Sequence, residues 1–213
     1  MKKVGVLGSG TVGEVLANGF LKHGFAVVRG SRDPSKLATW RDGAGANASV
    51  GTFAEAAAAD IVVLAVKGTA AEQAVELAGP ALAGKVVIDA TNPIADGPPV
   101  DGVVPFFTGP NDSLMERLQA KMPSARFVKA FSCVGNPQMV NPQYVGTRPS
   151  MFICGNDDAA KADVRGILET FGWDTEDMGR ATAARAIEPL CMLWCISGFL
   201  QNRWTHAFKV LTK

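Results

Sequence analysis

The sequence predicts an α/β protein built on a doubly wound parallel β-sheet. Apolar runs alternate with helical patterns through most of the 213 residues, which is typical of βαβ units arranged around a parallel sheet. The central runs Ile61–Val66 and Val86–Ile88 are continuously apolar rather than alternating. Strands that are buried on both faces of a parallel sheet have this pattern.

The same patterns place the individual elements. We expect strands at 3–7, 25–29, 48–50, 61–66, 85–89 and 126–130, and helices near 11–22, 34–41, 52–58, 70–78 and 112–121. The later part of the chain predicts a strand at 151–154, a helix at 157–171, a strand at 173–178 and a closing helix from 181 to about 208, bent at Pro189. That closing helix is apolar nearly all round between Leu190 and Leu200. We therefore expect it to be buried on more than one side, within the chain or against a partner subunit.

A glycine-rich turn follows the first strand directly, in the run Gly8-Ser9-Gly10-Thr11-Val12-Gly13. In a strand–turn–helix context, the first glycine allows the tight turn and the second lets the backbone approach a pyrophosphate. The third lets the helix lie close to the sheet. The helix that opens at Thr11 would point its free N–H groups at the phosphates. The motif predicts a dinucleotide site on a Rossmann sheet.

The end of the second predicted strand indicates which dinucleotide is bound. An NAD site places an acidic residue there to hold the ribose 2′-hydroxyl group. This chain has Ser31 and Arg32 instead, followed by Lys36, and a hydroxyl with a fixed cation suits a 2′-phosphate. The residues predict NADP(H), although Arg32 and Lys36 would also fit a solvated surface loop.

These assignments divide the chain into two parts. We expect residues 1–148 to form the NADP(H)-binding Rossmann domain. Residues 149–213 would form a small C-terminal α/β extension that ends in a long buried helix, packs on the first part and contributes to a dimer interface.

The carboxyl ends of the other strands should face the same crevice and surround the nicotinamide. They carry Ala65-Val66-Lys67-Gly68-Thr69, then Ala90-Thr91-Asn92-Pro93-Ile94, then Lys129-Ala130-Phe131-Ser132-Cys133. Thr91 and Asn92 could hydrogen-bond the carboxamide or the ribose, but Asn92-Pro93 also fits a plain turn. The segment 92–110 contains five prolines and predicts a long irregular loop at this edge.

Ionisable groups are sparse in these patches, where Lys67 and Lys129 are the only cations. The chain has no Tyr-x-x-x-Lys dyad and no cysteine or histidine spacing typical of a metal site. Reduction of a ketone or oxidation of an alcohol normally needs a positioned acid or base, whereas hydride transfer between two organic cofactors needs mainly stacking and exclusion of water. We therefore expect hydride transfer between NADP(H) and a flat acceptor cofactor. The alternatives are reduction of a small carbonyl or imine with Lys67 or Lys129 as proton donor, and a non-catalytic NADP(H)-sensing module.

Composition excludes several other classes of partner. The formal net charge is +1, so no broad basic surface favours nucleic acid. The first strand begins directly after Met1-Lys2-Lys3, which predicts no signal peptide, and we expect no membrane span. The four cysteines are expected to be reduced core thiols, so the sequence predicts a cytoplasmic protein.

Together these residues resemble the family of NADPH-dependent deazaflavin (coenzyme F420) reductases and the NADPH-binding domain of membrane metalloreductases. The resemblance covers nearly the whole chain. It is carried by the glycine turn, by Gly30-Ser31-Arg32 with Lys36, and by four further runs: Asp89–Pro93, Val128–Phe131, Phe152–Asn156 and Ala184–Leu190.

The resemblance implies that a deazaflavin or flavin stacks on the nicotinamide, with residues 91–94 and 131–134 in the acceptor pocket. It also implies a homodimer through the C-terminal helices. Two positions depart from the family pattern. Lys67-Gly68 stands where a proline and an aromatic residue are usual, and Ser132-Cys133 replaces the usual asparagine. Both lie on the acceptor side, so the sequence leaves the acceptor and the direction of transfer open.

Overall fold

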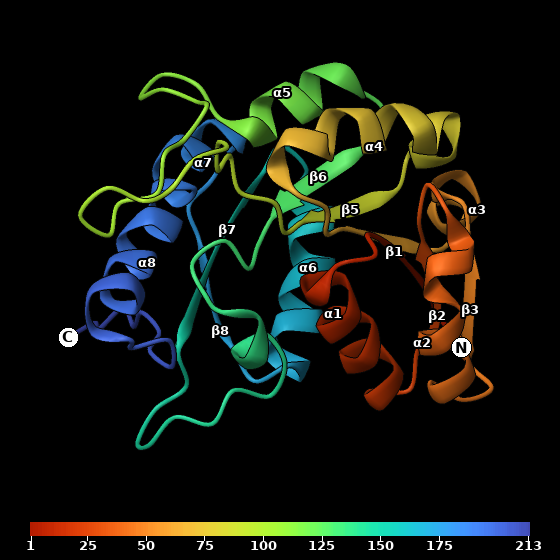
Figure 1. The fold of residues 1–213 in the computed structure, drawn as a ribbon, viewed down its shortest axis with the longest axis horizontal. Helices are drawn as coiled ribbons and strands as arrows, with labels where there is room; N and C mark the ends of the chain where they lie inside the picture. Colours follow the sequence, from red (N-terminus) through yellow and green to blue (C-terminus); the bar gives the residue numbers. More distant parts are fainter.

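The computed structural model describes residues 1–213 and contains one eight-stranded sheet with the order β3-β2-β1-β4-β5-β6-β7-β8 (Figure 1). The strands are β1 (Lys3–Leu7), β2 (Ala26–Gly30), β3 (Ala48–Gly51), β4 (Ile61–Leu64), β5 (Val86–Asp89), β6 (Arg126–Lys129), β7 (Ser150–Gly155) and β8 (Asp174–Asp177). Strands β1 to β6 are parallel, and β7 runs antiparallel to β6. The predicted fold class is confirmed.

Helices cover both faces of this sheet. They are α1 (Thr11–Lys22), α2 (Ala38–Gly43), α3 (Phe53–Ala57), α4 (Ala71–Ala78), α5 (Leu114–Lys121), α6 (Asp158–Thr170), α7 (Ala184–Ile187) and α8 (Pro189–Gln201). On one face, α1 and α6 form a core with residues such as Leu16 and Val164. On the other, α3, α4, α5 and α7 form a second core that includes Val75 and Leu118. The continuous apolar strands are buried because both faces are covered.

The strand order places a topological switch between β1 and β4, because the chain turns from β1 to β2 on one side and returns to β4 on the other. In sheets of this type, ligands bind outside the carboxyl ends of the strands at the switch. Helix α3 lies very close to β1 here, and a Cβ added to Gly5 would stand 1.9 Å from the Ala56 carbonyl oxygen. Only glycine fits that position.

The C-terminal part continues the same sheet, because β7 pairs with β6 and β8 pairs with β7. The predicted strands at 151–154 and 173–178 are therefore present. The predicted domain boundary between residues 148 and 149 stays a prediction, because β7 and β8, which follow it, extend the sheet formed by the strands that precede it.

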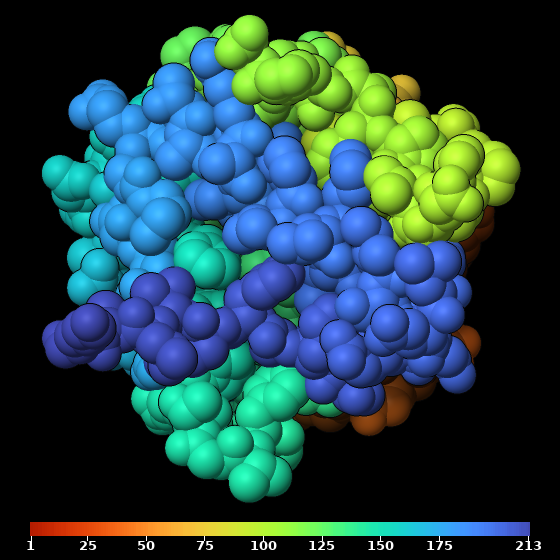
Figure 2. Space-filling model, turned by 90° about the vertical axis from the view of Figure 1, so that its left-hand side faces the viewer, coloured from red at the N-terminus to blue at the C-terminus, as the bar shows by residue number.

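One expectation about the closing helix, its length, is corrected. The helical stretch covers Ala181–Gln201 and not 181–208, because Asn202 adopts a left-handed conformation with φ of 52°. The residues beyond it run back along β7, where the Ser150 N–H donates to the Phe208 carbonyl at 2.9 Å. Figure 2 shows this C-terminal segment as a dark blue strip across one face of the molecule.

In the single chain α8 is buried along one face, and burial of its opposite face against a partner subunit stays a prediction. Within α8, only Cys191, Trp194 and Gly198 are buried, while Leu193 and Leu200 are 54% and 61% exposed. By length and composition alone the stretch Ala181–Gln201 could cross a membrane, a property it shares with core helices of water-soluble proteins.

Candidate functional site

The glycine turn joins β1 to α1 at the switch point. Gly8 has φ of 148°, and a Cβ there would lie 2.3 Å from the Ala65 carbonyl oxygen, so strand β4 approaches too closely for any side chain. A Cβ on Gly13 would lie 2.6 Å from the Gly8 carbonyl oxygen. Around Gly10 no atom lies within 4 Å of the corresponding position. The first and third glycines are thus required by the fold, and the second faces open space where a pyrophosphate could approach.

Helix α1 opens behind this turn without a side-chain cap, with Gly10 as its N-cap residue. The first N–H groups of the helix are free, and the helix dipole places partial positive charge beside them. This arrangement fits a bound phosphate.

A buried arginine on β2 hydrogen-bonds the backbone of the glycine turn. Arg29 on β2 is fully buried, and its Nη2 donates to the Gly10 carbonyl at 3.3 Å and, at 3.5 Å, to the Gly8 carbonyl. Its Nη1 pairs with Glu14 on α1 at 3.3 Å, and its guanidinium lies 4.9 Å from the ring centre of Trp40. Burial lowers the pKa of Arg29, but an arginine stays protonated at neutral pH. The side chain fixes the glycine turn to both β2 and α1.

A first hollow of about 320 Å³ lies in front of the turn. It brings together Gly8-Ser9-Gly10, Ser31, Arg32, Lys36 and the strand end Ala65–Lys67. Ser31 is buried and its Oγ accepts from the Asp33 N–H at 3.2 Å, while Arg32 and Lys36 are exposed. The hydroxyl and the two cations predicted for a 2′-phosphate therefore border one cavity.

A second hollow adjoins the first and shares Gly10 and Ala65–Lys67 with it. Its other lining residues are Thr11, Val12, Gly68, Ala90, Thr91, Asn92 and Ile94. Lys67 is its only ionisable lining residue. The two hollows form one groove across the switch point, with cations at one end and a nearly uncharged surface at the other.

Some predicted site residues do not border this groove. Pro93, Phe131 and Ser132 are buried and line neither hollow. Asn92 connects the two loops, since its Nδ2 donates to the Ser132 carbonyl at 3.0 Å. Phe131 has φ of 63°, an unusual conformation for a bulky residue that often marks functional sites. The roles of these residues in acceptor binding stay predictions.

The two candidate lysines differ sharply. Lys67 borders both hollows, with its side chain 61% exposed and paired with Asp96. Lys129 is fully buried, forms ion pairs with Asp89 and Glu188, and donates to the Thr91 carbonyl. Burial by itself would lower the pKa of Lys129, but the two carboxylates outweigh it and the pKa is raised. Lys129 does not line the groove, and its geometry does not fit a proton donor to substrate.

Sequence reasoning missed several residues of the site. Asp33, which directly follows Ser31-Arg32, also lines the first hollow. Phe53, Ala70, Gln73 and Ala74 complete it, and nothing in their local pattern marks them. Arg29, Asp89 and Glu188 could have been found, because each is a charged residue inside an otherwise apolar strand or helix. Buried charges are rare unless they are paired.

The fold, the glycine turn and the groove define an NADP-dependent oxidoreductase. The sequence profile described as "NADP oxidoreductase coenzyme F420-dependent" matches residues 3–93. A crystal structure described as a candidate F420-dependent NADP reductase from Arthrobacter sp. FB24 is 32% identical, covers 100% of both chains and superposes with a TM-score of 0.91. The chain belongs to this family.

Two further similarities agree with the fold. Metalloreductase STEAP3 of Rattus norvegicus is 30% identical over 190 residues, which make up 88% of this chain. The chain spans only 36% of the length of that protein. An imine reductase of Streptomyces aurantiacus is 21% identical with a TM-score of 0.66 over 90% of this chain and 61% of that one, which shows a shared fold.

The contrast between Gly10 and Gly13 gives a prediction. Gly13→Ala places a Cβ 2.6 Å from the Gly8 carbonyl oxygen and should lower the free energy of unfolding by about 1–3 kcal/mol. Gly10→Ala should change stability by less than about 1 kcal/mol and weaken NADPH binding about tenfold or more, a loss of about 1.4 kcal/mol. Thermal unfolding and fluorescence titration measure the two effects. Gly43→Ala, also in open space, is the control, and wild-type affinity in Gly10→Ala would contradict the assignment.

Proposed function

We propose that this protein transfers a hydride between NADP(H) and a flat acceptor cofactor, either the deazaflavin coenzyme F420 or a flavin. The observation that carries the proposal is the lining of the second hollow, where apolar and neutral side chains surround a single ionisable residue, Lys67. Transfer between two stacked rings needs alignment and exclusion of water, which such a surface provides. The family profile and the Arthrobacter protein support the same acceptor class.

In this proposal the chain's own residues bind and orient. Gly8-Ser9-Gly10 and the start of α1 would hold the pyrophosphate, and Ser31, Arg32 and Lys36 would hold the 2′-phosphate. Thr11, Val12, Ala65–Lys67 and residues 90–94 would surround the nicotinamide, with Phe131 and Ser132 behind them. The bound dinucleotide would donate the hydride as NADPH or accept it as NADP⁺, and the protein would align the rings.

The acceptor is tested by mixing the protein with NADPH and each oxidised acceptor in turn: coenzyme F420, FMN, FAD, and small carbonyl and imine compounds. Loss of NADPH absorbance measures turnover. The proposal expects turnover with a deazaflavin or flavin. Turnover with carbonyls or imines alone, abolished in Lys67→Met while NADPH affinity is kept, would establish the small-substrate alternative. Tight NADPH binding without any turnover would favour a sensing module.

The choice of NADP(H) over NAD(H) is tested at Arg32. Arg32→Ala removes charge-assisted bonds to the 2′-phosphate worth about 1.5–3 kcal/mol. NADPH affinity should therefore fall about tenfold or more, while NADH affinity barely changes. Arg41→Ala is the control, because Arg41 is exposed, pairs with Asp42 and lines neither hollow. An equal loss for both nucleotides would contradict a role in discrimination.

We also propose a homodimer through α8 in a cytoplasmic protein. Leu193, Phe199 and Leu200 are exposed on α8. The loop that carries Gly102 lies against the same helix, close to Leu200, and Figure 2 shows this yellow-green loop beside the blue C-terminal part. The four cysteines are free, which suits a reducing compartment. Burial raises the pKa of Cys133 and Cys154 to about 12, so these two thiols are poorly reactive.

Light scattering tests the dimer. The wild-type protein should have twice the mass of one chain, and Phe199→Glu with Leu200→Glu should reduce it to one, because buried charges oppose association. Leu77→Glu, at an exposed apolar position on α4, should leave the mass unchanged. A monomeric wild-type protein would contradict the proposal.

A further inference from the structure

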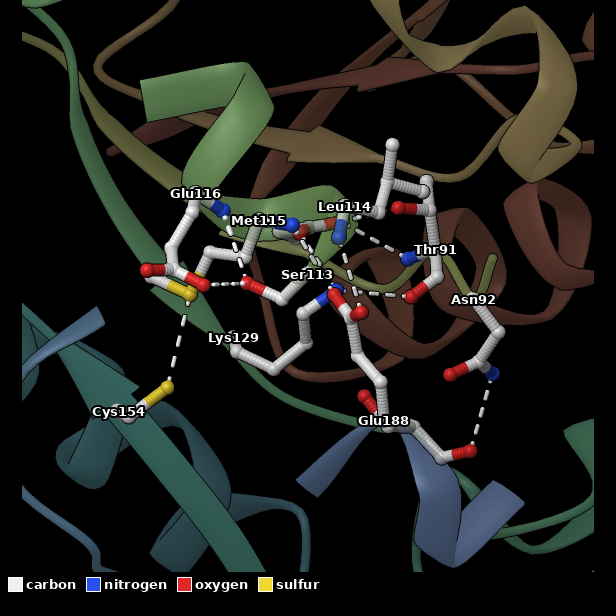
Figure 3. A network of polar contacts seen from close by, with 11 residues as sticks. Thr91, Asn92, Ser113, Leu114, Met115, Glu116, Lys129, Cys154 and Glu188 are labelled. Carbon is white, nitrogen blue, oxygen red and sulfur yellow. Dashed lines mark hydrogen bonds and ion pairs between the residues drawn. The ribbon is translucent and has the colours of Figure 1, made fainter. Parts of the chain in front are cut away.

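Three ionisable side chains meet in the interior where β5, β6, α5 and α8 come together. Lys129 Nζ lies 2.7 Å from Asp89 Oδ2 and 2.8 Å from Glu188 Oε1, and all three residues are at most 1% exposed. Figure 3 shows Lys129 reaching between the loop that carries Thr91 and the helix start that carries Glu188. None of the three lines the groove.

The cluster is almost fully satisfied. The Lys129 ammonium group has three oxygen neighbours: it forms ion pairs with the two carboxylates and donates a hydrogen bond to the Thr91 carbonyl oxygen at 2.9 Å. Glu188 also accepts from the N–H groups of Leu114 and Met115, each at 3.0 Å, at the start of α5. The dipole of α5 adds partial positive charge beside the net charge of −1. Glu188 thus ties α5 and the start of α8 to β6.

Stability alone does not account for this arrangement. Removing charges from water is costly, and well-packed apolar residues often replace a buried ion pair without loss of stability. Such a cluster fixes the geometry of its surroundings, because each contact constrains the position of its partner atom.

Thr91 is the residue held most completely. Asp89 Oδ1 accepts from the Thr91 N–H at 2.9 Å and from its hydroxyl at 2.6 Å, while Lys129 binds its carbonyl oxygen. The backbone donor, the backbone acceptor and the hydroxyl proton of Thr91 are all engaged by the cluster. Thr91 and the following Asn92 border the uncharged half of the groove.

This arrangement determines what the loop offers to a ligand. Since the Thr91 hydroxyl donates its proton to Asp89, its oxygen can only accept a further bond. The bond from Asn92 Nδ2 to the Ser132 carbonyl sets the orientation of the amide. In this orientation Asn92 Oδ1 is buried and has no hydrogen-bond partner. Two acceptor oxygens in one loop suit a ligand that carries an N–H₂ group, and the nicotinamide carboxamide has one.

We propose that Lys129, Asp89 and Glu188 are positioning residues that hold the Thr91–Asn92 loop in register for the nicotinamide end of the dinucleotide. The proposal rests on NADP(H) binding in the groove as described under Proposed function. It assigns Lys129 a role through Thr91, in place of direct proton donation. It also makes the reacting end of the groove depend on the attachment of α8.

The test compares two ligands that share the adenosine end of the groove. NADPH reaches both ends, whereas 2′,5′-ADP carries the 2′-phosphate and lacks the nicotinamide. The double variant Lys129→Met/Glu188→Gln keeps the net charge of the cluster at −1, and Glu188→Gln alone is the milder second variant. Lys161→Met is the matched control, because Lys161 is also a buried, paired lysine but contacts Asp158 and Asp177 near α6.

In the double variant we expect 2′,5′-ADP affinity to stay within about twofold of wild type while NADPH affinity falls about fivefold or more, close to 1 kcal/mol. With any acceptor that the wild type reduces, kcat should fall about tenfold or more, and KM for the acceptor should change less. Glu188→Gln should shift the same quantities in the same direction by less. Circular dichroism confirms that each variant is folded, and the Lys161→Met control should lose thermal stability without changing the ratio of affinities.

Parallel losses of NADPH and 2′,5′-ADP affinity, or an unchanged ratio in both folded variants, would overturn the proposal. If the double variant does not fold, the ratio in Glu188→Gln decides. The result is independent of the acceptor. A wild-type protein that binds NADPH but reduces no acceptor contradicts the proposed function, while the ratio of affinities still tests the positioning role.

Discussion

The buried contact between Lys129 and the carboxylates of Asp89 and Glu188 is the interaction on which the proposed nicotinamide end of the groove depends. It joins two strand ends to the first turn of α5 and to the start of α8. In a low-dielectric interior each of these bonds is strong, and an unpaired member would be costly. The loop at Thr91 therefore inherits its position from residues far apart in the chain.

The other half of the groove is built on a different constraint, close approach of backbones. The glycine turn fits between β4 and α1 because Gly8 and Gly13 have no side chains, and Arg29 ties its carbonyls to β2. The rigid turn faces Ser31, Arg32 and Lys36 across the first hollow. One end of the groove thus carries cations and the other is nearly uncharged, which agrees with the proposed placement of the phosphates at the first end and of the nicotinamide at the second.

Most of the fold could be predicted from local pattern. Each strand begins and ends within two residues of its expected position, because continuous apolar runs between turns leave little freedom in a covered parallel sheet. The sequence pattern predicts too long a closing helix, because aromatic residues after Gln201 continue the apolar pattern. Instead, Trp204 folds back over Gly198, and Trp194 donates to the His206 carbonyl at 2.8 Å. Left-handed Asn202 makes that reversal, and asparagine adopts this conformation more readily than most residues.

The candidate site was predictable where one segment carries the chemistry and not where distant segments share it. The glycine turn and Ser31-Arg32 lie in one short stretch, so their roles follow from order along the chain. The environment of Lys129 depends on Glu188, which is distant in sequence, and no local signal pairs them. The sequence correctly placed Lys129 at a strand end, but only the structure shows that its ammonium group points into the interior and not into the groove.

A crystal structure of the protein with NADP⁺ tests the central claim most directly. The account predicts the 2′-phosphate against Ser31, Arg32 and Lys36, the pyrophosphate over Gly10, and the carboxamide beside Thr91 and Asn92, with Lys129 still bound to Asp89 and Glu188. A dinucleotide with its 2′-phosphate elsewhere, or its nicotinamide outside the Thr91–Asn92 hollow, would contradict it.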